Sequence, residues 1–309
     1  MPALARRGFT LIELMIALVL LGIVSGAIYQ VLVNNQRVYQ AQTQQIDLQQ
    51  NLRAAATILP GEFRELDAAD GDIQGPLSAT SMTIRAMRKL GFICVAPVLG
   101  GGVGNISITV RKTPMFGRTL SFGGNDSLLV FFEGKATSRN DDTWLPAQVK
   151  GVTGGTCVLD PNPLNQGFVL QLQPQWLGAV DGTGKAVYNW PGAIPRGSPV
   201  RQFETVTYRV YQASDGKWYL GYEGVYPPAA IQPLIGPLTG SAGVEFDYYD
   251  STGAVTTVPN QVALIDIHLR AQTATPVRSG GAEGAIDYKV DSITTRVALR
   301  NNPRCGPCQ

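Results

Sequence analysis

The sequence predicts an α+β protein in which one long N-terminal helix packs on a mostly antiparallel β head. The first observation is an apolar run without proline from Phe9 to Val33. The second is a change to alternating apolar and polar residues from Ser78 onward, which is typical of strands with one buried face. The third is an abundance of turn formers after the helix, since the 309 residues include 35 glycines and 20 prolines.

The apolar run from Phe9 to Val33 has the length of a membrane span. At about 1.5 Å per helical residue it reaches roughly 37 Å, whereas a hydrocarbon core is about 30 Å thick. Arg6 and Arg7 precede the run and would hold that end at the cytoplasmic face, leaving the rest of the chain outside. One carboxylate, Glu13, lies inside the run, and an acidic residue there is costly unless it has a partner.

Three interpretations compete for this stretch. A removable secretory signal fits the charged start, and Ser25-Gly26-Ala27 would serve as a small-residue cleavage site. A plain signal anchor fits the length. Neither interpretation accounts for Glu13, so the third one starts from the residues around it.

The string from Gly8 to Leu14, GFTLIEL, resembles the class III signal of type IV prepilins and pseudopilins. In that family a dedicated prepilin peptidase cuts after the glycine and methylates the new N-terminal residue. The resemblance implies a leader of residues 1–8, cleavage between Gly8 and Phe9, and N-methylation of Phe9. Glu13 would become the fifth residue of the mature protein, where it can neutralise the Phe9 amine of the same or a neighbouring subunit.

The helix is expected to extend over residues 9–59, with 9–33 transmembrane and 34–59 amphipathic. The second part has no glycine or proline and is rich in glutamine, alanine and leucine. Residues three and four apart form one face, which should lie on the head; they are Val38, Ala41, Gln45, Leu48, Leu52, Ala55 and Leu59. A short coiled coil is the alternative. Pro60-Gly61, or the acidic stretch from Asp67, should end the helix.

The head, residues 60–309, is predicted from strand patterns and turn signals. A long strand is expected from Ser78 to Cys94, and Asp215-Gly216 predicts a hairpin turn. Further strands are expected at Ile106–Arg111, Thr119–Phe122, Leu128–Glu133, Gln148–Val152, Phe168–Leu172, Phe203–Tyr211, Lys217–Tyr222, Val244–Tyr249, Leu264–Arg270 and Ile286–Leu299. Residues 134–199 are rich in proline, glycine and asparagine, and predict a loop-rich insertion within one domain.

Three segments near the C-terminus add to the resemblance. Residues 243–250, 262–270 and 294–301 resemble the closing strands of PilW-type minor pilins and of J-type pseudopilins, the PulJ/GspJ type. The resemblance therefore covers the N-terminal helix and roughly the last sixty residues.

The four cysteines are Cys94, Cys157, Cys305 and Cys308. An exported head would lie in an oxidising compartment, so pairing is expected, with three connectivities possible; we favour Cys94 with Cys157 and Cys305 with Cys308. The C-terminal CGPC matches the thioredoxin tetrapeptide, but a redox role needs a helix that begins at the motif, and here one residue follows. A zinc site of four thiolates is disfavoured because there is only one CxxC.

Other chemical signals are weak, and no enzyme activity or cofactor is predicted. His268, the one histidine, is expected to be a satisfied or solvent-facing strand residue. Asp67, Asp70 and Asp72 are weak candidates for calcium ligands, but their spacing differs from that of an EF-hand loop. A solvated loop at the end of the helix is the favoured interpretation of these aspartates.

The formal net charge is +2, and loss of Arg6 and Arg7 with the leader would bring it to 0. This charge gives no support to nucleic-acid binding, except indirectly through a DNA-uptake machine.

The resemblance implies a non-catalytic minor pilin or pseudopilin in the bacterial inner membrane, with an extracytoplasmic head, which then enters a pilus or pseudopilus filament. Its partners would be prepilin peptidase, other pilin or pseudopilin subunits and the inner-membrane assembly platform. The large head favours a priming or tip position, by family analogy. The alternatives are a pseudopilin of type II secretion or DNA uptake, and a membrane-anchored binding or adhesin domain.

Overall fold

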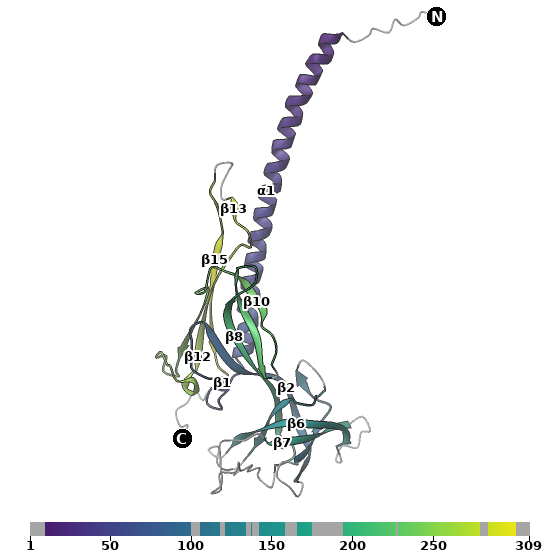
Figure 1. Ribbon diagram of the computed structural model, residues 1–309. Helices are drawn as coiled ribbons and strands as arrows, with labels where there is room; N and C mark the ends of the chain where they lie inside the picture. Colours follow the sequence, from purple (N-terminus) through teal and green to yellow (C-terminus); the bar gives the residue numbers. More distant parts are fainter. Residues whose placement is uncertain are drawn as a thin grey trace, which may run out of the picture.

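A computed structural model describes residues 10–99, 106–117, 121–133, 137, 142–157, 166–174, 194–226, 228–278 and 284–300. One long helix, α1 (Leu11–Phe63), leads into a β-rich head and projects far beyond it (Figure 1). All pairings between the described strands are antiparallel. The predicted α+β fold is therefore confirmed.

The strands of the head follow one another along the chain with a single 3-10 turn, η1 (Pro259–Gln261), in the described part. They are β1 (Ile73–Gln74), β2 (Ser81–Leu99), β3 (Ile106–Arg111), β4 (Phe116–Gly117), β5 (Ser127–Phe132), β6 (Thr143–Thr156), β7 (Gln166–Pro174), β8 (Pro199–Gln212), β9 (Trp218–Tyr226), β10 (Gln232–Leu238), β11 (Val244–Tyr249), β12 (Leu264–Gln272), β13 (Val277–Arg278), β14 (Ile286–Asp287) and β15 (Val290–Ala298).

Helix α1 packs on the head only along its C-terminal third. Its buried residues are Leu48, Leu52, Ala55, Leu59 and Phe63, spaced three and four apart as one helical face requires. The sequence predicted that this face begins at Val38, but Val38 and Gln45 are exposed. The prediction was wrong there because only the narrow β13–β14 hairpin reaches so far along the helix (Figure 1).

The helix ends at Phe63, between the two predicted stop signals. Pro60 lies inside its last turn, where the ring removes one backbone donor. Arg64 nevertheless donates its backbone N–H to the Pro60 carbonyl at 3.0 Å. Phe63 is fully buried, with its ring centroid 5.6 Å from that of Tyr208 and 6.0 Å from that of Phe246. The burial of Phe63 in the core therefore stabilises a last helical turn that contains Pro60.

Six strands close into a barrel at the end of the head farthest from the N-terminus (Figure 1). They pair in the order β2, β3, β7, β6, β5 and β8, and β8 pairs again with β2 from Ser81↔Arg209 to Phe92↔Pro199. Side chains fill the interior, as in other small barrels; the buried ones include Ile108, Val110, Leu128, Val130, Ala147, Val149, Leu170 and Val200.

Two of the barrel strands, β6 and β7, lie in the stretch predicted to be a loop-rich insertion. The expected strands Gln148–Val152 and Phe168–Leu172 are cores of these longer strands. Glycine and proline within β6 concealed its length in the sequence. Gly155, for example, is required by close packing, since a Cβ there would lie 2.5 Å from Val169 Cγ2.

The second part of the head is a sheet that carries α1. β8 leaves the barrel and pairs with β9, and the sheet continues through β10 and β12 to β11 and β15. A second core, separate from that of the barrel, joins this sheet to the helix; it includes Leu52, Leu59, Ile84, Tyr208, Leu220, Phe246, Ile267 and Val297. β2 and β8 run through both parts.

Two predictions about strands were wrong. β10 was missed because its sequence, QPLIGPL, has two prolines; its pairing with β9 shifts register around Pro233 and Ile235, which accommodates them. The strand expected at Thr119–Phe122 is not formed by its described residues, Ser121 and Phe122, while Thr119 and Leu120 lie outside the described residues. The neighbouring β4 pairs with β2 instead.

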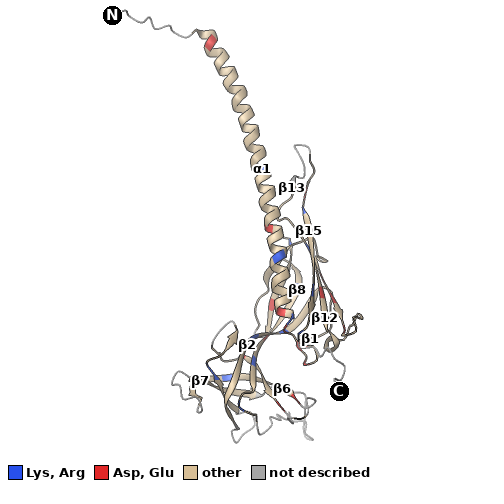
Figure 2. Cartoon of the chain, turned by 180° about the vertical axis from the view of Figure 1, so that it is seen from behind, with Lys and Arg blue, Asp and Glu red and all other residues tan. Residues whose placement is uncertain are grey.

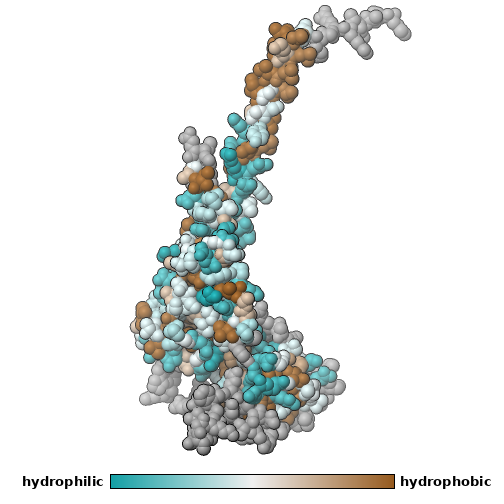
Figure 3. Space-filling view, viewed as in Figure 1, coloured by the Kyte–Doolittle hydropathy of each residue, from teal (hydrophilic) through white to brown (hydrophobic). Residues whose placement is uncertain are grey.

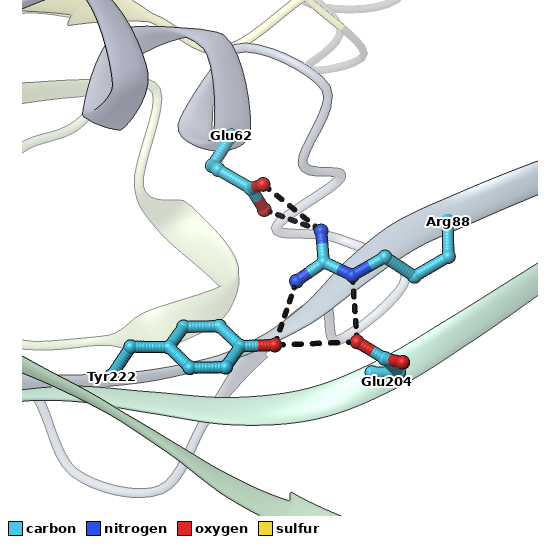
Figure 4. A network of polar contacts seen from close by, with 4 residues as sticks. All are labelled: Glu62, Arg88, Glu204 and Tyr222. Carbon is cyan, nitrogen blue, oxygen red and sulfur yellow. Dashed lines mark hydrogen bonds and ion pairs between the residues drawn. The ribbon is translucent and has the colours of Figure 1, made fainter. Parts of the chain in front are cut away.

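A buried arginine joins the end of α1 to the point where sheet and barrel meet (Figure 4). Arg88 Nη1 lies 2.8 Å from Glu62 Oε2, its Nε lies 2.7 Å from Glu204 Oε2, and its Nη2 donates to the Tyr222 hydroxyl at 3.2 Å. Burial alone would lower the pKa of Arg88, but the hydrogen bonds to Glu204 and Glu62 outweigh it and raise that pKa. α1, β2, β8 and β9 are thus tied at one point.

The predicted disulfide between Cys94 and Cys157 is present. It joins β2 to the end of β6 across 63 positions of sequence, with a Cα–Cα distance of 5.4 Å. The second predicted pair, Cys305 and Cys308, lies outside the described residues.

Replacement of Arg88 by methionine should leave Glu62 and Glu204 without their cation. Because both carboxylates keep partial contact with water, the free energy of unfolding should fall by about 2–4 kcal/mol. Urea unfolding of the full chain in detergent, followed by tryptophan fluorescence, measures this. Arg209→Met is the matched control, since Arg209 and Glu223 form a partly exposed pair at 2.6 Å and should contribute about 1 kcal/mol or less. Equal losses in both variants would contradict the role given to Arg88.

The double variant Cys94→Ala and Cys157→Ala should destabilise the barrel. A closed loop of this length corresponds to roughly 4 kcal/mol of lost chain entropy in the unfolded state. Hydrogen exchange should rise in β6 and β7 but remain slow in β12 and β15, which belong to the other core. Uniform exchange through both parts would show that the two cores do not unfold separately.

Candidate processing and assembly site

The described chain begins at Thr10, directly beside the predicted cleavage site. Arg6, Arg7, Gly8 and Phe9 lie outside the described residues. Thr10 is the N-cap of α1, and its hydroxyl accepts the backbone N–H of Glu13 at 3.3 Å. In the sequence, the predicted cleavage site therefore immediately precedes the residue that caps the helix.

Glu13 closes a reciprocal capping box with Thr10. Its Oε2 accepts the backbone N–H of Thr10 at 2.9 Å and the Thr10 hydroxyl at 2.9 Å. Thr10 and Glu13 stand three residues apart at the start of an apolar run, which is the sequence signature of this cap. This signal was missed in the sequence, where Glu13 was considered only as a charge. The carboxylate is thus held over the helix N-terminus, beside the peptide nitrogen that follows Phe9.

The next twenty or so residues of α1 expose apolar side chains in every direction. The chain has no charged residue between Glu13 and Arg37, and Figure 2 shows this stretch uncharged. Figure 3 shows predominantly hydrophobic colours along it, and none of its most apolar window is buried by the head. In the described part of the chain, α1 is the one helix long and apolar enough to cross a membrane. It is continuous through Gly22, Ser25 and Gly26.

The aspartates after α1 form a closed turn. Asp72 was expected in a solvated loop but is fully buried; its Oδ2 lies 3.1 Å from Arg201 Nη2 and accepts the Asp67 N–H at 3.0 Å. Burial raises the pKa of Asp67 and of Asp70, and the charges of neighbouring aspartates add to both shifts. Over the described residues, no group of three or more histidine, cysteine or acidic side chains is placed to hold a metal ion.

His268 is a satisfied strand residue, as expected. Its Nε2 lies 3.1 Å from Asp247 Oδ2 on β11, and its Nδ1 lies 3.0 Å from Thr294 Oγ1 on β15. The ring therefore links the three strands on the face of the sheet opposite α1.

A groove of about 540 Å³ opens beside the β11–β12 turn. Its lining includes Tyr249, the turn at Asp250 and Arg296. Asp266 holds Arg296 with two hydrogen bonds of 2.6 and 2.7 Å, and Asp250 accepts the N–H groups of Thr252 and Ala254 within its own turn. The charged groups of the groove are thus already bonded to the chain itself.

Comparison with known proteins identifies the N-terminal segment. Residues 4–29 match the family model described as the prokaryotic N-terminal methylation motif. No curated protein and no solved structure matches the chain. The matched residues include the string GFTLIEL and most of the exposed apolar stretch of α1.

The matched segment starts before the capping box and extends along the part of α1 that the head does not cover. The C-terminal end of the same helix packs on the β-rich head. The N-terminus of this chain is a type IV pilin-like class III signal, of the kind that prepilin peptidase processes, on an apolar helix suited to anchor the chain in a membrane.

Proposed function

We propose that this protein is a non-catalytic minor pilin or pseudopilin that enters a type IV pilus-like filament through α1. Prepilin peptidase cleaves between Gly8 and Phe9, and Phe9 becomes N-methylated. The observation that carries this proposal is the methylation motif over residues 4–29, placed on a helix that continues unbroken to Phe63.

Burial of the apolar part of α1 requires surroundings that the head does not supply. More than a dozen leucine, isoleucine and valine side chains between Leu11 and Leu32 are over half exposed. Each contributes about 1.5–3 kcal/mol when removed from water, so the whole stretch amounts to tens of kcal/mol. The bilayer supplies this environment before assembly, and a bundle of similar helices supplies it in the filament.

The capping box explains how Glu13 can receive the new amine. Its Oε2 is bonded to the Thr10 N–H, one residue from the amine that cleavage creates on Phe9. A methylated amine remains a cation at neutral pH, so it and the carboxylate compensate each other in apolar surroundings. The pairing applies equally to the amine of the same subunit and to that of a neighbour.

The distal barrel supports a priming or tip position. It adds bulk at the end of the head farthest from the membrane helix, where a terminal subunit has free space (Figure 1). The same placement favours a second candidate function, a membrane-anchored binding or adhesin domain that displays the barrel. A pseudopilus of type II secretion and a DNA-uptake filament share the first architecture. Loss of surface motility, exoprotein release or transformation in a deletion strain separates these machines.

Gly8→Asp should block processing. The intact mass of the variant should include the eight leader residues, whereas the wild-type protein should start at Phe9 and carry one added methyl group. Gly22→Ala is the control, because a Cβ at Gly22 contacts nothing within 4 Å and the change lies away from the cleavage site. A wild-type protein that starts near Ile28 would instead indicate ordinary secretion.

Glu13→Gln separates the charge of Glu13 from its capping role. Glutamine can still accept the Thr10 N–H but cannot neutralise an amine, so both Glu13→Gln and Glu13→Ala should insert in the membrane and lose filament incorporation. Thr10→Val removes the cap, which costs about 1 kcal/mol of helix stability, and keeps the charge. Quantification of sheared filaments by immunoblot measures the effect. Normal incorporation of Glu13→Gln would contradict the charge pairing.

A further inference from the structure

The β13–β14 hairpin presents an apolar row away from α1. The hairpin runs beside the helix toward its N-terminal end (Figures 1 and 2). Ile286, Tyr288 and Val290 occupy alternate positions on its returning segment and are 61, 41 and 58 % exposed. Between them, Lys289 Nζ donates to Gln45 Oε1 of α1 at 3.3 Å. Because successive side chains of an extended segment point to opposite sides, the apolar row faces away from the helix.

The opposite side of the molecule carries a second row, on α1. Tyr39, Ile46 and Arg53 recur every seven residues, which is close to two helical turns, so they share one face. That face points away from the buried positions, Leu48 to Leu59, that contact the sheet. Tyr39 is 72 % and Ile46 is 53 % exposed, and Arg53 is exposed as well. This row on α1 is therefore apolar at its end near the membrane span, and carries a positive charge at its end nearer the head.

Two hydrogen bonds fix the heights of these rows along the helix axis. Lys289 bonds Gln45, and the Arg300 N–H donates to the Arg64 carbonyl at 2.8 Å. The 19 positions from Gln45 to the C-cap Arg64 thus run alongside the 11 positions from Lys289 to Arg300, so each residue of the strand corresponds to about 1.7 residues of the helix. This ratio puts Val290 level with about Ile46, and its extension beyond Lys289 puts Ile286 level with about Tyr39.

The same ratio puts an acidic group level with Arg53. Thr294 falls at that height, and its hydroxyl is bonded to His268. His268 is in register with Thr294 on one side and with Glu245 of β11 on the other, and Glu245 is exposed on the outer face of the sheet. The apolar residues of the α1 row therefore lie at the same level along the helix axis as the apolar residues of the hairpin. The arginine of the α1 row lies at the same level as a carboxylate on the sheet.

We propose that these rows form a docking surface between two copies of this chain held side by side in a membrane. The bilayer keeps identical spans at one depth, so parallel copies meet without an axial offset. Tyr39 and Ile46 of one copy then pack on the hairpin row of the next, and Arg53 meets Glu245. This inference rests on the proposed membrane placement of α1, and needs neither cleavage nor a filament.

The contact is small, so the membrane is part of its strength. A few side chains on each face bury less than the roughly 1,200–2,000 Å² of a stable protein interface. Anchoring both copies in one bilayer raises their effective concentration and aligns them. Pairing should therefore occur in vesicles and be lost in dilute detergent.

Photocrosslinking of the full chain in vesicles of phosphatidylethanolamine and phosphatidylglycerol tests the contact. With p-benzoylphenylalanine in place of Ile46, irradiation should give a species of twice the chain mass, with the bond mapped by mass spectrometry to residues 286–290. The same probe at Ile58, which is exposed a third of a turn around the helix, should give no such species. Adducts to lipid alone, or to another segment of the chain, would overturn the proposal.

A charge exchange between two variants tests the register. Arg53→Asp and Glu245→Arg should each lower the crosslinked yield roughly tenfold, because like charges then face each other. Mixing the two variants in one bilayer should restore crosslinking, since an opposite pair re-forms across one interface. Asp47→Arg, an exposed charge off the row, should leave the yield unchanged. Failure of the mixture to recover would refute the register, whereas a retained leader would bear only on processing.

Discussion

The structure depends on one constraint: α1 is far longer than the sheet that covers it. Five residues from Leu48 to Phe63 are buried in the head, and the preceding apolar stretch has no cover from the described chain. Water is an unfavourable environment for such a stretch, so the fold is complete only when lipid or other helices surround it. The head packs only on the last four turns of this helix, which is roughly 80 Å long, so the contacts along those turns must hold the two together.

The attachment combines apolar packing with a buried ion network. Leu59 and Phe63 enter the core beside Tyr208 and Phe246, while Glu62, one residue before Phe63, meets Arg88. The network alone would be a weak source of stability, because desolvation offsets much of the charge attraction. Its geometry has a more specific effect, since Arg88 can satisfy carboxylates from α1 and β8 only when helix, sheet and barrel are all correctly placed.

Sequence periodicity predicted the elements that have regular faces. The helix, the long β2 strand and the strands β11, β12 and β15 follow from 3.6- and two-residue spacings. The expected oxidising compartment predicted that the cysteines pair, and the favoured pair Cys94–Cys157 is present. Barrel closure depends on pairing between β2 and β8, which are over a hundred residues apart and have no local signal. The capping box was visible in Thr10 and Glu13 but was overlooked, and β10 was hidden by prolines that its irregular register tolerates.

The sharing of β2 and β8 between the two parts of the head has a mechanical consequence. The barrel is not suspended on a flexible linker; it continues two hydrogen-bonded strands that begin beside the helix. A pull applied at the distal end would be carried along both strands into the sheet. Tension would thus reach the sheet that carries α1 through two continuous strands rather than through a linker.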